Sequence, residues 1–228
     1  MIAGGTGISR KFYGPFAQYL SSFCSLVVTF DYQGTSRTVA DLKKMSQISI
    51  KREWANDTAD VVKWASAKGA SSTDLVLVAH SVGGHIVGFL DDEAASLISR
   101  ILLVSVNNAY WSWQSWGIVS AIVFPFSVAA STHVLGYYKS SLLGLGLDLP
   151  SGIARQWSHW TFFPEYMRHN PETAKKFDRF PASIPIEAIA FSDDELSSNL
   201  KAFEWTALQM LPNRSARFLA LKPTKKPR

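Results

Sequence analysis

Short runs of apolar, often β-branched residues alternate along this chain with longer segments in which apolar residues recur every three or four positions. Strands that are covered by helices on both faces are apolar at nearly every position, so this alternation is typical of a mostly parallel sheet with helices on both faces. The pattern therefore predicts an α/β fold. The expected strands are Leu26–Phe30, Leu75–Val78, Ile101–Val106, Ile184–Phe191 and Arg217–Leu221, and the expected helices lie near Phe12–Ser22, Trp54–Ala67, Gly83–Leu90 and Asp194–Leu211.

The alternation stops between about Asn107 and Phe180. Five of the eight tryptophans lie in this stretch, and its pattern is mostly helical. We predict that residues 107–180 form an inserted helical cap within a single α/β domain of residues 1–228. A chain of 228 residues, 47% of them apolar, is long enough to bury one large core, and no repeat or low-complexity linker divides it.

The most apolar stretch runs from Trp116 to Ser131. A membrane-spanning helix needs roughly 20 apolar residues, whereas this stretch is shorter and has Pro125 near its centre. We therefore expect an apolar helix that is buried or docked on a surface, and we do not expect membrane association. The 23 basic residues outnumber the 18 acidic ones, but they are scattered except in the tail Lys222–Arg228, so we expect no nucleic-acid partner.

The start of the chain and its cysteine content bear on location. No basic segment and apolar run of a secretory signal follow Met1. The single cysteine, Cys24, cannot form an internal disulfide, and between apolar neighbours it is expected to be buried. We predict a cytoplasmic protein; the sequence does not indicate its oligomeric state.

The strongest local pattern is an apolar strand, a tight turn and a helix at Leu75–Val87. Within it, Ala79, Ser81 and Gly83 have the spacing of a nucleophile elbow, in which serine sits on a strained turn between small residues. Such a turn exposes the Ser81 hydroxyl above the sheet and places the Val82 N–H at a helix N-terminus, where it can donate to a developing oxyanion. Ser81 is the candidate nucleophile; the alternative is an ordinary strand-to-helix turn.

A glycine-rich turn follows the short first strand, at Gly4–Gly7. In enzymes with a nucleophile elbow, the loop after such a strand supplies the second oxyanion N–H, and Ile8 is the candidate donor. A dinucleotide-binding unit is a rival interpretation, because Asp31 closes the next strand. That motif requires a small residue where this chain has Arg10, so we predict no cofactor.

Several segments resemble one family of proteins. Val28–Gly34 is similar to a strand end near the start of α/β-hydrolases, with Gln33 in place of the usual arginine, and Trp54–Trp64 is similar to the helix before their elbow. The insertion resembles that of a poorly characterised bacterial-type subgroup of predicted serine hydrolases, at Tyr110-Trp111, Gly136–Tyr138, Leu143–Gly146, Leu149–Gly152 and Ala154–Trp157. The resemblance covers nearly the whole chain. It implies the α/β-hydrolase fold and a hydrolase chemistry, but no substrate.

In α/β-hydrolases the catalytic acid follows the nucleophile in the sequence and the histidine comes last. By analogy with the family's turn, Asp194, shortly after the predicted strand Ile184–Phe191, is the candidate acid, with Asp193 in reserve. Either carboxylate could instead cap the helix that follows.

The catalytic histidine is missing from the place where the family has it, after the last strand. All five histidines precede Asp194: His80, His85, His133, His159 and His169. The first two flank the nucleophile and cannot readily reach its hydroxyl. Since serine needs a base, three explanations stay open: a chain truncated at both termini, a non-catalytic protein that keeps the fold, or a histidine of the insertion acting as the base.

The leading hypothesis is therefore a serine hydrolase that cleaves an ester or amide bond of a small apolar acyl or aromatic substrate beneath the tryptophan-rich insertion, without a metal or cofactor. The alternative is a catalytically impaired or non-enzymatic binding protein with an α/β-hydrolase-like fold. A peripheral membrane protein that docks through residues 116–131 is the third and least favoured hypothesis.

Overall fold

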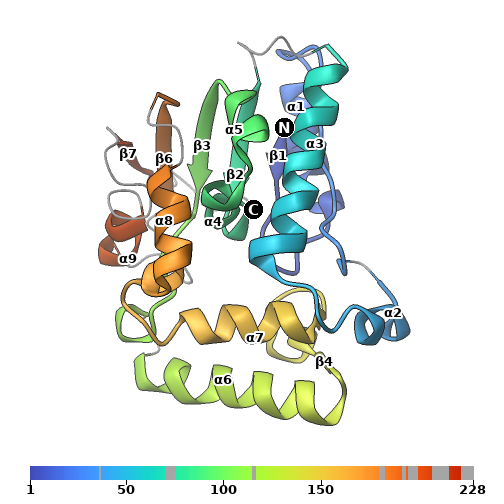
Figure 1. The fold of residues 1–228 in the computed structure, drawn as a ribbon, viewed down its shortest axis with the longest axis vertical. Helices are drawn as coiled ribbons and strands as arrows, with labels where there is room; N and C mark the ends of the chain where they lie inside the picture. Colours follow the sequence, from blue (N-terminus) through green and yellow to red (C-terminus); the bar gives the residue numbers. More distant parts are fainter. Residues whose placement is uncertain are drawn as a thin grey trace, which may run out of the picture.

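The computed structural model describes residues 1–35, 37–69, 75–114, 117–179, 183–191, 194, 200–206 and 216–221. Within these residues one sheet has five parallel strands in the order β1-β2-β3-β6-β7 (Figure 1). The strands are β1 (Ile2–Ala3), β2 (Val76–His80), β3 (Arg100–Val104), β6 (Ile186–Phe191) and β7 (Ala216–Leu221).

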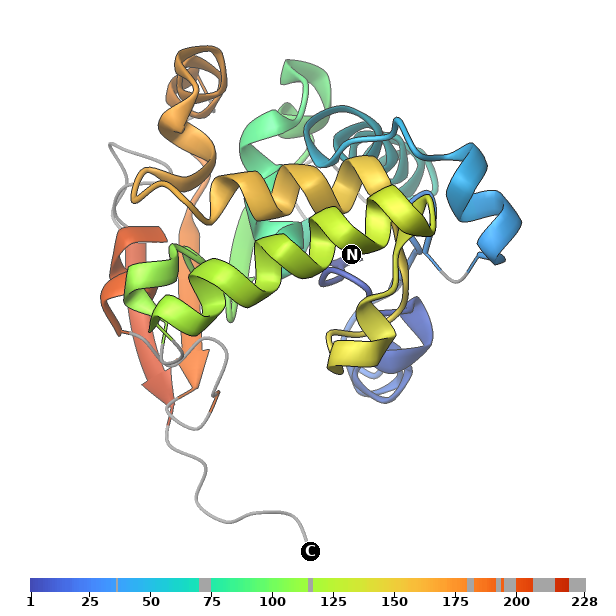
Figure 2. The same cartoon turned by 90° about the horizontal axis from the view of Figure 1, so that it is seen from below.

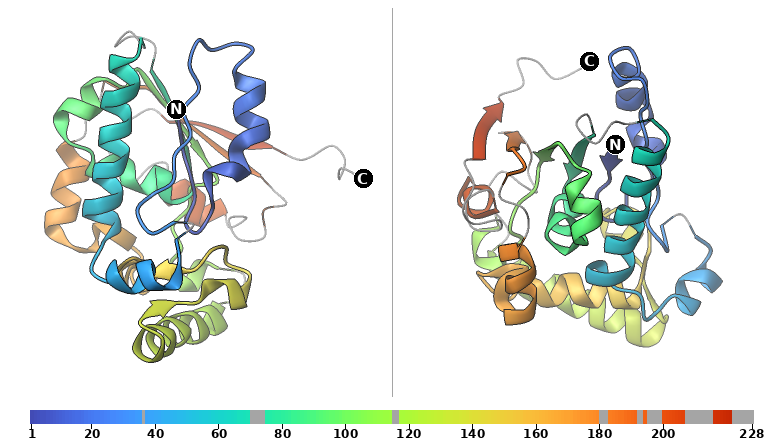
Figure 3. Two further views of the ribbon diagram at one scale, coloured as in Figure 1. Left: turned by 90° about the vertical axis from the view of Figure 1, so that its right-hand side faces the viewer. Right: turned by 45° about the horizontal axis from the view of Figure 1, so that its top comes forward.

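Helices lie on both faces of this sheet, which confirms the predicted α/β class. In the left view of Figure 3, α3, α5 and α8 lie on one side of the sheet and α1 lies on the other. The described helices are α1 (Gly14–Leu20), α2 (Val39–Lys44), α3 (Ala55–Ala67), α4 (Val82–Ile86), α5 (Asp92–Ser96), α6 (Gly117–Val134), α7 (Ser151–Trp160), α8 (Pro171–Arg179) and α9 (Leu200–Trp205). Shorter helical turns are η1 (Arg10–Tyr13), η2 (Ile50–Trp54), η3 (Val87–Phe89), η4 (Trp111–Trp113), η5 (Ser140–Leu143) and η6 (Tyr166–His169).

The first expected strand is the main difference from the predicted elements. Of Leu26–Phe30, only Thr29 forms a bridge, to Ile2 of β1. Since β1 is only two residues long, it offers too few backbone groups for a longer ladder. The prediction for Cys24 was also wrong, because its side chain is exposed.

The segment between β3 and β6 lies across the carboxyl ends of the strands, as Figure 2 shows from below. We call residues 107–180 the inserted segment. In it, α6 packs along α7, and the antiparallel pair β4 (Tyr137–Tyr138) and β5 (Leu149–Pro150) lies beside α2.

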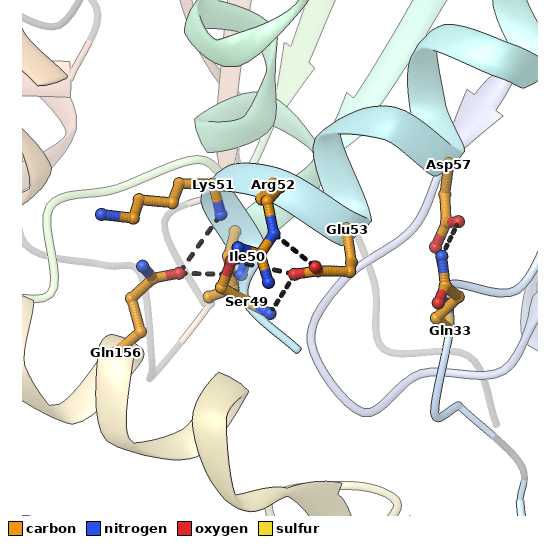
Figure 4. Close-up of polar contacts among 8 residues, drawn as sticks. All are labelled: Gln33, Ser49, Ile50, Lys51, Arg52, Glu53, Asp57 and Gln156. Carbon is orange, nitrogen blue, oxygen red and sulfur yellow. Dashed lines mark hydrogen bonds and ion pairs between the residues drawn. The ribbon is translucent and has the colours of Figure 1, made fainter. Parts of the chain in front are cut away.

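Polar contacts join the inserted segment to the sheet's own helices (Figure 4). The Gln156 side-chain oxygen accepts the backbone N–H groups of Ile50 and Lys51, at 2.7 and 3.2 Å. Nearby, the backbone and side-chain N–H groups of Gln33 both donate to the Asp57 carboxylate at 2.8 Å. The Gln156 bonds hold η2, just before α3, against α7 and so help to position the inserted segment, whereas the Gln33 bonds hold the turn after residue 32 to α3.

Candidate active site

The turn after β2 has the geometry of the predicted elbow. Ser81 lies between β2 and α4 with φ 52° and ψ −119°, a backbone conformation that L-residues rarely adopt. Its N–H donates to the Val104 carbonyl at 3.1 Å, and its own carbonyl accepts the Gly84 N–H at 2.9 Å. The strained turn is thus held from both sides, as in other functional sites where local strain persists.

Close packing explains the small residue two positions after Ser81. A Cβ atom on Gly83 would lie 2.5 Å from the Ala3 carbonyl oxygen of β1, which is backbone and cannot rotate away. We expect Gly83→Ala to lower the free energy of unfolding by about 2 kcal/mol, because β1 or α4 must shift. Urea unfolding monitored by circular dichroism measures this change.

The matched control is Gly14→Ala at the start of α1. A Cβ atom there meets nothing within 4 Å, and the backbone at Gly14 is already helical, so stability should stay the same or rise slightly. Equal losses in the two variants would contradict the packing argument.

Ser81 lines a cavity of about 760 Å³ between the strand ends and the inserted segment. The size falls within the range of pockets for small organic ligands. Most of the lining is apolar, and many of the apolar side chains come from the inserted segment: Trp111, Val119, Val123, Phe124, Leu143, Leu145, Trp157 and Trp160. The polar side of the cavity includes Ser81, His80, His85, Ser105 and Asp194.

The glycine-rich loop reaches the cavity with Thr6 and Ile8, but the backbone N–H of Ile8, the expected donor, already has a partner. The Ile8 N–H donates to the Gly5 carbonyl at 3.2 Å, in a turn whose third residue, Gly7, has φ +67°. In this turn the Ile8 N–H, which the sequence suggested as an oxyanion-hole donor, is hydrogen-bonded to the Gly5 carbonyl. Thr6 lines the same cavity from within the turn.

A tyrosine joins this loop to the elbow. The buried Tyr13 hydroxyl accepts the Gly5 N–H at 2.7 Å and lies 2.8 Å from Nδ1 of His80. Because the hydroxyl oxygen accepts from Gly5, its own proton can be donated to Nδ1; in that arrangement the neutral imidazole carries its proton on Nε2. Burial lowers the pKa of His80, against the opposing charge of Asp194, and burial raises the pKa of Tyr13 to about 12.

We expect Tyr13→Phe to raise the pKa of His80 and to lower the free energy of unfolding by roughly 1–2 kcal/mol. The first effect follows because the hydroxyl stabilises the neutral imidazole, and the second because the Gly5 N–H loses its partner. NMR titration of the His80 ring and urea unfolding measure them. Tyr19→Phe, at an exposed tyrosine, should change neither; an unchanged His80 pKa in Tyr13→Phe would contradict the assigned hydrogen bond.

The other four histidines are not arranged as a base for Ser81. His85 lines the cavity, but its Nε2 is 3.0 Å from the Asn107 carbonyl. His133, His159 and His169 are exposed and do not line the cavity. The structure therefore gives no support to a base supplied by a histidine of the inserted segment.

His85 makes the fold sensitive to acid. Burial lowers the pKa of His85 from 6.5 to about 4, with the bond to Asn107 opposing the change. Below pH 6.5 the unfolded chain therefore binds a proton that the folded chain takes up only near pH 4, so stability is lost across this interval. We expect a loss of roughly 3 kcal/mol between pH 7 and pH 4, and the lowered pKa of His80 adds a loss of the same sign.

Urea unfolding at several pH values measures how the free energy of unfolding changes with pH in the wild type and two variants. His85→Gln should make the fall in stability between pH 7 and pH 4 smaller, because glutamine does not titrate, whereas His133→Gln, at an exposed position, should leave it as in the wild type. An unchanged fall in His85→Gln would show that His85 is not a source of the pH dependence.

Asp194, the predicted acid, lines the cavity just after β6, and its N–H donates to the Phe191 carbonyl at 3.2 Å. The reserve candidate Asp193 lies outside the described residues. Within the described residues, no group of three or more His, Cys, Asp or Glu side chains is placed to bind a metal ion.

Two residues of the site were not found from the sequence. Tyr13 gives no local sign that it contacts His80, which is 67 positions away. Ser105, the residue after β3, lines the cavity, is buried, and has φ 47°, close to that of Ser81. Because β2 and β3 pair in register from His80 to Val104, Ser105 is the next-strand neighbour of Ser81.

Comparison with known proteins agrees on the fold. The chain matches solved structures of a hydrolase from Oleispira antarctica (17% identity, TM-score 0.54), a monoacylglycerol lipase from Paleococcus ferrophilus (10%, 0.54) and a thermophilic esterase from Thermogutta terrifontis (15%, 0.53). Each match covers 97% of this chain and 82%, 83% and 79% of the other chain, respectively. No family model and no curated protein matches the sequence. At these identities the likeness shows the α/β-hydrolase fold alone.

Proposed function

We propose that this chain, which has the α/β-hydrolase fold, is a serine hydrolase that cleaves an ester or amide bond of a small apolar acyl or aromatic substrate. The observation that carries the proposal is Ser81 on a strained strand-to-helix turn at the wall of a mostly apolar cavity of about 760 Å³. The structures with this fold include proteins named as an esterase, a lipase and a hydrolase, which supports the same chemistry.

In the proposed reaction, Ser81 Oγ attacks the substrate's carbonyl carbon and the carbonyl oxygen becomes an oxyanion. The first donor to this oxyanion is the Val82 N–H. Val82 is the first residue of α4, so the helix provides no carbonyl four residues earlier to accept this N–H. For the second donor we propose the Thr6 N–H, because the N–H groups of Gly5 and Ile8 already have partners within the protein. The inserted segment acts as a cap that keeps water from the acyl group.

The proton on Ser81 Oγ must pass to a base. We propose Asp194, which lines the cavity just after β6, as the acid. No histidine follows it in the given sequence, and His80 is the cavity imidazole whose pKa responds to the charge of Asp194. An oxyanion hole and binding alone leave a residual acceleration of about 10³–10⁴ over water. We therefore expect slow turnover unless His80 or another group accepts the proton.

The single cysteine supports a reducing, cytoplasmic location.

Labelling of the wild-type protein with a fluorophosphonate, followed by peptide mass spectrometry, tests the proposal. The expected result is one adduct, on Ser81. If the folded protein, verified by circular dichroism, carries no adduct, Ser81 is not an activated nucleophile and the hydrolase proposal fails.

A second candidate function is binding without catalysis. It is favoured because each of the two imidazoles that line the cavity already has one ring nitrogen engaged within the protein. His80 Nδ1 is hydrogen-bonded to the Tyr13 hydroxyl, and His85 Nε2 to the Asn107 carbonyl. A protein that takes up a medium-chain fatty acid in equilibrium dialysis, but is not labelled by the fluorophosphonate, would have this function. Failure to take up any apolar acyl ligand would exclude it.

A further inference from the structure

The outward face of α6 is apolar along the whole helix. Its exposed side chains recur at helical spacing, and Ile118, Ile122, Phe126 and Val134 are 67%, 62%, 72% and 77% exposed. No Asp, Glu, Lys or Arg occurs in Gly117–Val134, and its one histidine is the exposed His133 in the last turn. A water-soluble protein rarely exposes so continuous an apolar surface unless something covers it. Among the described helices, α6 alone is long and apolar enough to cross a membrane by length and composition.

The opposite face of α6 is held to the protein, which argues that the helix does not leave it. Val128 is buried, Ser131 donates to the Tyr137 carbonyl at 2.9 Å, and Thr132 accepts from the Arg155 side chain at 3.1 Å. A helix that crossed a bilayer would lose these bonds and its packing on α7. Figure 2 shows α6 lying alongside α7 across the bottom of the molecule, an orientation in which one face of the helix can lie in the plane of a surface.

The apolar face of α6 continues into the mouth of the Ser81 cavity. Val119 and Val123 of α6 are each 50% exposed, and they also line the cavity. Leu143, from the neighbouring turn η5, likewise combines exposure with a place in the lining, and Leu142 beside it is exposed. A protein partner seated on this surface would cover the mouth, whereas a lipid layer presents acyl chains to it.

Three cationic residues lie near the carboxyl end of α6. The stem of Lys43 lies against Gly136, two residues after the helix, and the Arg155 side chain donates to Thr132. The backbone N–H of Lys139 donates to the Ser131 hydroxyl. None of these three cations has a carboxylate within ion-pair distance in the described part of the chain. An exposed apolar helix with unpaired lysine and arginine residues near its carboxyl end is complementary to a bilayer with anionic headgroups.

We propose that the outward face of α6, together with Leu142 and Leu143, docks onto the surface of a phospholipid bilayer containing anionic lipids, with the mouth of the cavity facing the acyl chains. The helix lies in the interface and does not span it. This docking goes beyond the proposed hydrolase function and does not require Ser81 to be reactive.

Flotation with vesicles of phosphatidylcholine and phosphatidylglycerol tests the proposal. We expect the full chain to float with vesicles that contain phosphatidylglycerol, and to float less with phosphatidylcholine alone. Replacing Ile122 and Phe126 together by serine should reduce the bound fraction, expressed as a partition coefficient, roughly tenfold or more. Vesicles with brominated acyl chains should quench tryptophan fluorescence in the wild type and less in the double variant.

Matched variants separate docking from folding and from catalysis. Trp64→Ser removes a half-exposed aromatic from α3 instead, and it should float like the wild type. Ser81→Ala should also float like the wild type, so a failed hydrolase proposal does not affect this test. Circular dichroism establishes that each variant is folded. Lys43→Glu with Lys139→Glu should weaken binding to the anionic vesicles.

Two results would overturn the proposal. One is a wild-type protein that stays in the bottom fraction at every lipid composition. The other is a wild-type dimer in sedimentation velocity that the Ile122→Ser, Phe126→Ser variant converts to a monomer while vesicle binding is absent. That result would make the α6 face a contact between two copies of the chain.

Discussion

Ser81→Ala is expected to abolish fluorophosphonate labelling and, where His80 or another group accepts the Ser81 proton in the wild type, to lower the hydrolysis of a short-chain p-nitrophenyl ester by at least about 10³-fold. The expectation follows because a nucleophile and its base act as a unit, so removal of either leaves only what the oxyanion hole and binding supply. The measurement is kcat/KM for the purified wild type and variant at the same pH.

Ser105→Ala is the matched control for Ser81→Ala. Both serines follow adjacent parallel strands, both have positive φ, and both line the cavity, but only Ser81 precedes a helix. Hydrolysis and labelling should therefore survive in Ser105→Ala. If Ser81→Ala keeps the wild-type rate, no base activates Ser81 and the binding function is the better account.

Trp54→Ala is expected to lower the free energy of unfolding by about 4 kcal/mol. The indole is fully buried at the start of α3 and stacks on Tyr32 at 4.7 Å between ring centroids. Its N–H donates to the Gln33 carbonyl at 2.9 Å. The substitution leaves a large cavity, removes an aromatic stack and removes the hydrogen bond to the Gln33 carbonyl, all at the contact between the 32–35 turn and α3.

Trp64→Ala, on the same helix, serves as the control for Trp54→Ala. Its side chain is 50% exposed, so the loss should be less than about 1 kcal/mol. Urea unfolding gives both values from the transition midpoint and slope. Similar losses at the two positions would mean that burial of Trp54 contributes little beyond helix propensity.

Much of the fold was predictable because its signals are local. The apolar runs at residues 75–78, 101–106 and 184–191 correspond to β2, β3 and β6 within a few positions. The run at Leu26–Phe30 has the same composition but only one bridge, because strand formation depends on what lies beside it. The residues of Leu26–Phe30 do not reveal that the neighbouring strand, β1, is only two residues long.

The candidate site was also predictable only in part, where its signals are local. The small residues around Ser81 predict a strained turn, and φ 52° is what the structure shows there. The candidate donor Ile8 was predicted from its place in the loop, but the loop closes a turn on its N–H. The roles of Ser81 and Asp194 as nucleophile and acid stay predictions until the labelling experiment.

By itself, the sequence determined the α/β class, the order of its elements and the elbow at Ser81, because backbone conformation depends on residues a few positions apart. Only the tertiary structure decided that Tyr13 joins Gly5 to His80, that the three histidines of the inserted segment do not line the cavity, and that α6 turns an apolar face outward. These facts depend on which surfaces pack together. The composition of α6 is the same whether its apolar side is buried or exposed, so its apolar sequence alone could not reveal a surface for lipid.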